Sequence, residues 1–124
     1  MSKQQLIKNI DGFTIELKHP ITGKPTGERL EIHENNFEHK MDWHQANKIC
    51  EEFGNGWRLP LRSELELIYA DLMQNRNGNF KKDWYWSGTQ SSSLRVWTKH
   101  FGEGTLAHGF FKSDYAYVCA VRTI

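Results

Sequence analysis

The two cysteines of the chain, Cys50 and Cys119, could take part in the widest range of chemistry. A thiol can act as a nucleophile, bind a metal or form a disulfide, depending on its pKa and its neighbours. The N-terminal residues contain no apolar segment long enough for an export signal, and disulfides are rare in a reducing cytosol. We therefore expect buried, inert thiols or an occasional structural disulfide rather than a catalytic pair.

The six histidines are the next candidates, because a neutral imidazole is a common metal ligand. Three of them flank the first expected helix at spacings that match no compact zinc motif, namely His33, His39 and His44. His100 and His108, with Glu103 between them, bracket a short expected hairpin and could converge on one metal ion. We favour the simpler interpretation of polar side chains on exposed strand faces, and we expect no metal and no cofactor.

The motifs of several common enzyme classes are missing from the sequence. It contains no Gly-x-Ser-x-Gly nucleophile elbow, no phosphate-binding glycine loop and no His-Glu-x-x-His zinc motif. The neighbouring carboxylates Glu51 and Glu52, like Glu64 and Glu66, fall on expected helices, where solvation or capping explains them. The sequence therefore predicts a protein that is not an enzyme.

Length and charge limit the classes of partner. With 124 residues the chain can form one hydrophobic core, so we expect a single domain over residues 1–124. Sixteen basic and fifteen acidic residues leave a net charge of +1, which gives no broad attraction for nucleic acid or an anionic membrane. No segment approaches the roughly 20 apolar residues of a membrane span. We expect a protein that is cytoplasmic as synthesised; association with an assembled particle or delivery to a host are the alternatives.

The first half of the chain predicts a β-hairpin and a helix. Apolar and polar residues alternate over 13–17 and over 30–32, and a loop with two prolines and two glycines lies between them at 19–27. After Asp42, the expected N-cap, apolar residues recur at helical spacing as far as Phe53. The glycines that follow permit the left-handed backbone that ends a helix.

The second half predicts another helix and then strands. The short apolar run 56–60 stops at a proline, and a helical pattern follows it until the turn expected at 75–79. Trp57 is expected to wedge the two helices against a sheet. Four strands are expected after Asp83, at 84–87, 94–101, 105–111 and 115–122. The order of hairpin, two helices and antiparallel meander predicts an α+β domain.

Five short motifs occur in a fixed order along the chain. They are W-x-x-A-x-x-x-C at 43–50, G-W-R-L-P with E-L at 56–65, Y-W-S-G at 85–88, Trp97 with Phe101 and Gly102, and Y-V-C-A-V-R at 117–122. Together they resemble the bacterial DUF1566 family, which includes the C-terminal domain of the Legionella collagen-like adhesin and belongs to the wider C-type-lectin-like fold. The resemblance covers residues 40–122 approximately and implies two helices packed on a twisted antiparallel sheet. Residues 1–39, a lead-in and hairpin, are less typical.

The resemblance also implies a set of scaffold residues. A cysteine of the first helix faces one on the last strand in C-type-lectin-like domains, and Cys50 and Cys119 match these positions. A bond between them would close a loop of about 70 residues and stabilise the fold by about 4 kcal/mol in the chain-entropy model. No thiol then remains for the cysteine chemistry of the formylglycine-generating enzymes that share this fold. The scaffold set is Cys50, Cys119, Trp57, Leu59, Pro60, Trp86 and Trp97.

The sequence departs from the family pattern at two positions. Leu61 stands where a Thr commonly caps the second helix, and Ser63 with Glu66 could form a shifted capping box instead. Lys99 stands where an apolar residue is common, so this strand is expected to be an edge or to present a charge. The triplets that bind calcium in sugar-binding members are absent, so the fold alone predicts no calcium-dependent sugar binding.

The last strands and their loops are the expected ligand surface. Trp97, Lys99 and Phe101 should share one face of their strand, and the opposite face should be open to a ligand. The expected ligand-binding residues are Ser91, Ser92, Ser93, Arg95, Thr98, His100, His108, Phe110 and Lys112. This mixed aromatic, basic and hydroxyl surface suits a protein or a glycan.

The leading hypothesis is a non-enzymatic module that binds a macromolecule through this surface. We expect a protein partner, as for an adhesin, a phage-related recognition protein or an intracellular adaptor or inhibitor; a glycan is the alternative ligand. Two further hypotheses stay open. One is a metal-dependent binder or enzyme centred on His100 and His108, and the other is a structural subunit of an oligomer.

Overall fold

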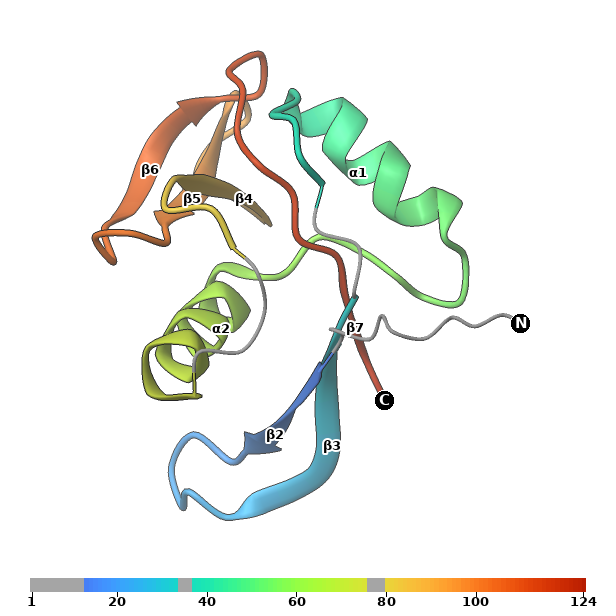
Figure 1. Ribbon diagram of the computed structural model, residues 1–124, viewed down its shortest axis with the longest axis vertical. Helices are drawn as coiled ribbons and strands as arrows, with labels where there is room; N and C mark the ends of the chain where they lie inside the picture. The colour runs from blue at the N-terminus through green and yellow to red at the C-terminus, as the bar shows by residue number, and fades with distance from the viewer. Residues whose placement is uncertain (1–12, 34–36, 76–79) are drawn as a thin grey trace.

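The computed structural model describes residues 13–33, 37–75 and 80–124 (Figure 1). These ranges hold two helices and two three-stranded antiparallel sheets, so the predicted α+β class is confirmed. The lead-in expected at residues 1–10 lies outside the described residues. Within the described part, neither helix is long and apolar enough to cross a membrane.

The expected N-terminal hairpin is present. Strand β2 (Phe13–Lys18) pairs antiparallel with β3 (Pro25–Ile32). Because β3 begins at Pro25, inside the segment expected to be a loop, the turn is tighter than the sequence indicates. The third strand of this sheet is β7 (Val121–Thr123), which pairs with β3 and brings the C-terminal end of the chain beside the hairpin.

Helix α1 (Trp43–Glu52) begins and ends as the sequence predicts. The carboxylate of Asp42 accepts a hydrogen bond from the Gln45 N–H at 2.9 Å, and the Gln45 side chain accepts one from the Asp42 N–H. This reciprocal capping box satisfies backbone donors that a helix start leaves unpaired. The helix is followed by residues 54–56, which all have positive φ angles, of 69°, 56° and 85°.

The start of helix α2 (Arg62–Asn75) is capped by two side chains, one from its own first turn and one from the neighbouring sheet. The Leu61 N–H donates to Glu64 Oε1 at 2.8 Å, and the Arg62 N–H donates to the Thr89 hydroxyl at 3.0 Å. Leucine has no side-chain acceptor to cap the helix itself. Thr89 of the neighbouring sheet instead supplies a hydroxyl acceptor at this helix start.

The shifted capping box expected from Ser63 and Glu66 is wrong. Glu66 instead forms an ion pair with Lys99, whose ammonium also donates to the Gly104 carbonyl at 2.8 Å and lies 4.7 Å from the Tyr69 ring centre. Lys99 is buried by these contacts rather than presented at an edge. It ties α2 to the turn that follows its strand.

The second sheet is a meander of three strands. It consists of β4 (Trp84–Gln90), β5 (Arg95–His100) and β6 (Leu106–Phe111), paired antiparallel in that order. The register between β5 and β6 shifts between Val96 and Thr98. This irregularity places an extra residue in β6 and changes which of its side chains share a face.

The expected fourth strand meets this meander at a single bridge, to Tyr85 of β4, and does not extend it as a strand. Residues 116–121 instead make single bridges to three different segments: Ala116 to Met41, Tyr117 to Tyr85, and Val121 to Arg58. The segment then continues into β7 beside the hairpin. Two separate sheets therefore replace the single twisted sheet that the resemblance implies.

Residues 116–121 run between two hydrophobic clusters. The even-numbered side chains pack into one cluster, and the odd-numbered side chains pack against the other. The first cluster contains Ala46 and Cys50 of α1 and the fully buried indole of Trp86. This alternation is the period of an extended chain, but here both of its faces are buried.

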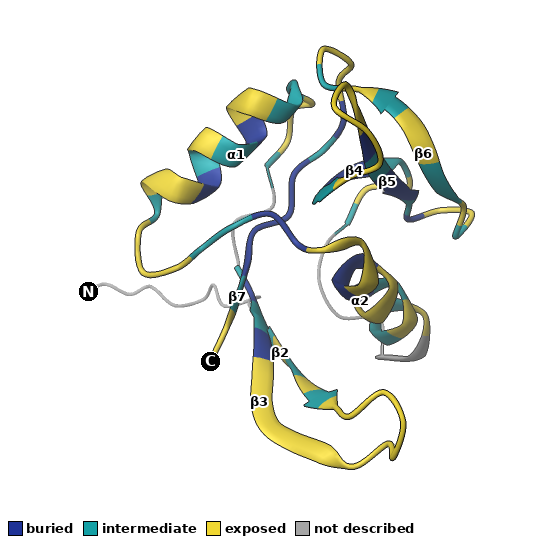
Figure 2. Ribbon diagram, turned by 180° about the vertical axis from the view of Figure 1, so that it is seen from behind, coloured by how far each residue is buried: buried dark blue, intermediate teal, exposed yellow. Residues whose placement is uncertain are grey.

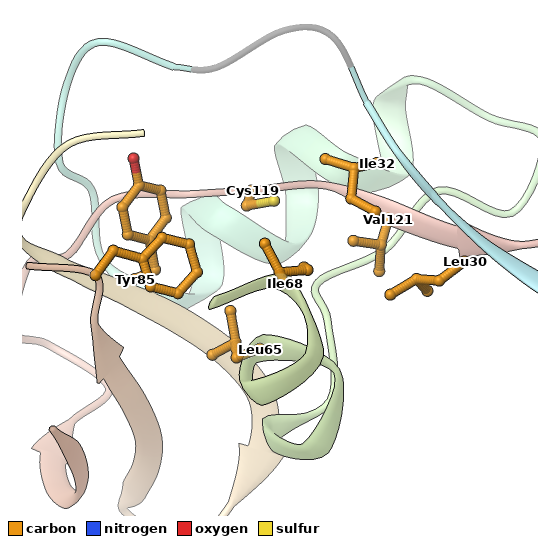
Figure 3. Close-up of a cluster of buried hydrophobic side chains, with 8 residues drawn as sticks. Leu30, Ile32, Leu65, Ile68, Tyr85, Cys119 and Val121 are labelled. Atoms are coloured by element: carbon orange, nitrogen blue, oxygen red, sulfur yellow. The ribbon is translucent and has the colours of Figure 1, made fainter. Parts of the chain in front are cut away.

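The other cluster joins α2 to the hairpin. Figure 3 shows Leu65 and Ile68 of α2 near Cys119, with Leu30 and Val121 completing the same group. Burial is concentrated around these two clusters, whereas the far end of the hairpin is exposed (Figure 2). The hairpin is thus anchored at one end only.

Residues 56–60, where Trp57 is expected to wedge the helices against a sheet, connect the parts of the fold mainly through their backbone. Arg58 exchanges two backbone hydrogen bonds with Val121, at 2.9 and 2.8 Å, and the Pro60 carbonyl accepts from the Gly88 N–H at 2.7 Å. The Trp57 indole is only half-buried, beside the His33 ring at 4.5 Å. Leu59 and Pro60 are buried, as the scaffold assignment expects.

Replacing Glu64 by Ala is expected to lower the free energy of unfolding by about 2 kcal/mol. The nearly buried carboxylate accepts from both Arg58 guanidinium nitrogens, at 2.7 and 3.0 Å, and from the Leu61 N–H. Chemical denaturation followed by tryptophan fluorescence measures the change. The control is Glu103→Ala, at an exposed turn, which should cost less than about 0.5 kcal/mol; equal losses would contradict the capping role.

Candidate functional site

The face of β5 expected to be open is buried. Val96 and Thr98 are both 0% exposed, and Thr98 lies directly across the strands from the buried Trp86. The predicted grouping of side chains holds, but α1 covers this face, since its small Ala46 and Cys50 side chains let the helix pack closely on the sheet. Thr98 is therefore not a ligand-binding residue, and the prediction that it is one is wrong.

Phe110 also belongs to this covered face. Its ring lies 5.2 Å from the Trp84 ring and 5.8 Å from the Trp86 ring, and it is half-buried. Its main contacts are thus with the core of the same chain. The next residue, Phe111, points to the opposite side and is 42% exposed.

His100 and His108 do not form a common site. His100 Nδ1 accepts hydrogen bonds from the Gly102 and Glu103 N–H groups, at 3.1 and 3.0 Å, and its ring packs edge-on against Trp84. His108 packs instead against Trp97. Nowhere in the described ranges do three His, Cys, Asp or Glu side chains gather in a metal-binding group, so the structure does not bring His100, Glu103 and His108 together.

Trp97 is more exposed than its scaffold assignment predicts. It is half-buried, the Arg62 guanidinium lies 4.4 Å from its ring centre, and the His108 ring lies 5.3 Å away. These neighbours cover much of its surface. Trp97, on the central strand β5, therefore packs against side chains of its own chain rather than offering a free ring to a ligand.

The serine-rich loop between β4 and β5 is held by its own hydroxyl groups. Ser91 donates to the His108 carbonyl at 2.6 Å, and the Ser92 hydroxyl accepts from the Arg95 N–H at 3.1 Å. Ser93 is exposed in the same loop. The loop is consequently a fixed support for the residues beside it.

Arg95 and Lys112 are the two predicted site residues that lie next to an exposed apolar group. The Arg95 guanidinium is 4.5 Å from the Phe111 ring centre, and Lys112 Nζ is 4.9 Å from the Trp43 ring centre. Leu94, which is 65% exposed, is adjacent, since its carbonyl accepts from the Lys112 N–H. Trp43 is tied to the same place by its N–H, which donates to the Lys112 carbonyl at 3.1 Å.

We call the group of Leu94, Arg95, Phe111 and Lys112, together with the neighbouring Trp43, the Leu94–Phe111 surface. Beside it is a hollow of about 340 Å³ between the start of α1 and the end of β6. Its lining residues are Asp42, His44, Leu94, Phe111, Lys112 and Ser113. The surface therefore combines exposed apolar side chains, a concave shape and two cations.

The carboxylates nearest to this surface are already engaged by the chain. Asp42 caps α1, and Asp114 accepts from the Phe111 N–H at 2.8 Å. Among the described residues, neither Arg95 nor Lys112 makes an ion pair. The cations at this surface remain available to an acidic group of a partner.

Sequence reasoning missed the apolar part of the site. The sequence pattern predicts ordinary strand residues at Leu94 and Phe111, and a helix and its flank at Trp43 and His44. The pair Phe110–Phe111 carried a usable signal, because adjacent residues of a strand point to opposite faces and one of the two must leave the core.

Both cysteines are free thiols buried in the core. Burial, and secondarily Glu51, raises the pKa of the Cys50 thiol to about 12. Burial also raises the pKa of the Cys119 thiol, and the charge of Cys50 raises it further. Neither group ionises near neutral pH, and both are scaffold residues.

Thr98→Val should raise the free energy of unfolding by about 1 kcal/mol, since valine keeps the shape of threonine without its hydroxyl. The Thr98 hydroxyl has no hydrogen-bond partner among the described residues. Thermal denaturation measures the change. The control is Ser87→Ala, which loses a bond to the Trp97 carbonyl at 2.7 Å and should be destabilised; a destabilised Thr98→Val would contradict the assignment.

Stability should fall at alkaline pH because of the raised pKa of Cys50. Below about pH 8.5 the thiol is protonated in both states, whereas above it only the unfolded state ionises, until the folded pKa is reached. The expected loss for Cys50 is about 2 kcal/mol by about pH 10. Denaturation under reducing conditions, at pH values on both sides of 8.5, measures it.

The Cys50→Ala variant separates this effect from other alkaline titrations. Cys119 and Tyr85 also have raised pKa values, because they are buried, and they contribute to the loss in both proteins. The variant should lose less stability than the native chain over the same pH range. An unchanged pH dependence would show that the thiol does not titrate differently in the folded state.

Comparison with known proteins identifies a fold but no family. No family model matches the chain, and no curated protein is similar to it in sequence. A complex of a mutant von Willebrand factor A1 domain with botrocetin contains a chain that matches with a TM-score of 0.53 and 10% identity, over 80% of this chain and 92% of that one. The crystal structure of botrocetin matches with a TM-score of 0.52 and 12% identity, over 79% of this chain and 92% of that one. The chain therefore has an α+β fold of the C-type-lectin-like kind.

Proposed function

We propose that this chain is a non-enzymatic module that binds a protein partner through the Leu94–Phe111 surface. The observation that carries the proposal is the combination of exposed Leu94 and Phe111 with Arg95 and Lys112, two cations without an ion pair among the described residues. Exposed apolar groups next to a concave surface are typical of protein interfaces.

The chemistry of the surface indicates what the partner should present. An apolar side chain could enter the hollow between Leu94, His44 and Phe111. A carboxylate beside it would meet Arg95 and Lys112 at its edge. A partner segment with an apolar anchor next to an acidic residue therefore fits best.

The surface is held in place before any partner arrives. The Lys112 N–H donates to the Leu94 carbonyl at 3.1 Å, and the Asp114 carboxylate holds the Phe111 N–H. The guanidinium of Arg95 is packed on the Phe111 ring. Since these groups are already ordered, binding would cost little side-chain entropy.

Further support comes from the chemistry of the remaining candidates and from the fold. The thiols are buried with raised pKa values, and His100 accepts two backbone hydrogen bonds, which argues against catalysis by these groups. A solved structure with a similar fold is a complex of botrocetin with a protein domain, which is a precedent for protein binding by this fold. We also infer membership of the DUF1566 family and a cytoplasmic site of synthesis.

The proposal is tested by quantitative capture and then by titration. The immobilised chain is compared with its Phe111→Asp variant in extracts of the source cells, and proteins enriched only by the native chain are purified. Titration calorimetry should show that Phe111→Asp or Arg95→Glu weakens binding of the purified protein about tenfold or more, because each removes a central contact. Met73→Asp, an exposed apolar position on α2, is the matched control and should bind normally.

Two results would overturn the proposal. One is a captured protein that binds the native chain and Phe111→Asp equally well. The other is binding of soluble oligosaccharides, at the same surface, with no protein enriched. Retained far-ultraviolet circular dichroism in every variant shows that any loss of binding is not a loss of fold.

A further inference from the structure

The tip of the β2–β3 hairpin is an exposed structure for which this chain supplies no partner within its described residues. Residues 18–29 are all exposed, and Ile21 at the tip is 89% exposed. In Figures 1 and 2 the tip lies at the lower end of the molecule, away from α1 and the second sheet. An isoleucine in such a position gains nothing from the core of its own chain.

The tip is nevertheless well ordered by local hydrogen bonds. The His19 N–H donates to the Lys24 carbonyl at 2.8 Å, and the His19 Nδ1 accepts from the Ile21 N–H at 3.2 Å. Gly23 has a φ of 72°, which closes the turn with a backbone that glycine adopts easily. The chain thus holds Ile21 outward in a fixed conformation, as a preformed contact would require.

The tip is also positively charged. Lys18 and Lys24 flank it, and the sequence between them contains no carboxylate. Neither lysine makes an ion pair with any described residue. The structure that fits this tip should therefore be an apolar hollow with an acidic edge.

The outer side of α1 offers such a hollow. Its volume is about 420 Å³, and its lining residues are Met41, Gln45, Lys48, Ile49 and Glu52. Met41 and Ile49 provide an apolar floor. Lys48 is the cation of the lining, but the C-terminal end of the helix next to it is acidic.

That helix end lacks the charge that would normally balance it. Glu51 and Glu52 occupy the last turn of α1, which contains no basic residue, and the helix dipole adds partial negative charge there. Neither carboxylate makes an ion pair with a described residue. The hollow therefore matches the tip in polarity, and the acidic helix end beside it matches the tip in charge.

We propose that this chain binds a second copy of itself head to tail, with the hairpin tip of one copy against the α1 hollow of the next. Ile21 would contact Met41 and Ile49, and Lys18 or Lys24 would approach Glu52. In both ribbon views the tip lies at the lower end and α1 in the upper half, so the two parts of one molecule are far apart (Figures 1 and 2). The contact joins different patches, so repeated contacts give a ring if they close and a filament if they do not.

Sedimentation and light scattering over a range of protein concentrations test this contact. The average mass should rise with concentration at low salt and fall when salt screens the lysines. Ile21→Asp should reduce the association constant about tenfold or more, since it removes the apolar anchor and places a carboxylate near Glu52. Met73→Asp is the matched control at another exposed apolar position and should associate like the native chain.

Mixing two variants distinguishes this contact from a symmetric one. Ile21→Asp keeps an intact hollow, and Glu52→Arg keeps an intact tip. Each variant alone should be monomeric, whereas an equal mixture should form dimers and nothing larger. Phe111→Asp should associate normally, because the Leu94–Phe111 surface is not involved.

A native chain that stays monomeric at every concentration and salt level would overturn the proposal. A mixture that stays monomeric although the native chain associates would also overturn it, because the contact would then lie elsewhere. The proposal would also be overturned if the Ile21→Asp variant associated as strongly as the native chain. Circular dichroism of each variant confirms that the substitutions at these exposed positions leave the fold intact.

Discussion

The fold depends on the burial of both faces of the segment at residues 116–121. Its side chains alternate between two hydrophobic clusters, while its backbone bridges three different parts of the chain. A segment buried on both faces cannot leave its polar groups unpaired. Those bridges therefore set the relative positions of α1, the hairpin and the second sheet.

The position of the proposed binding surface follows from the way in which the two helices cover the β4–β5–β6 sheet. α1 packs on one face of the β4–β5–β6 sheet, and α2 with Lys99 occupies the other. With both faces of the central strand β5 covered, its exposed side chains lie where the strand begins. Leu94, Arg95, Phe111 and Lys112 lie at this end of the sheet, so the candidate site is at an edge of the sheet and not on its face.

Short-range patterns in the sequence predict the local features of this fold but not which faces of the sheet are covered. Asp42, the left-handed turn after α1 and the buried pair Leu65 and Ile68 were predictable, because capping, glycine conformation and helical spacing act over a few residues. The face of β5 was not predictable in this way. Alternation shows which side chains share a face, but not whether a helix covers that face.

The sequence by itself determined both helices, the hairpin, the three strands of the meander and the α+β class. The tertiary structure decided that the last segment pairs with the hairpin, that Thr89 rather than Ser63 caps α2, and that Phe111 rather than Phe110 is exposed. Local patterns depend on neighbours a few positions away, whereas these outcomes depend on contacts between residues far apart in the chain. Such contacts form only where packing brings distant segments together.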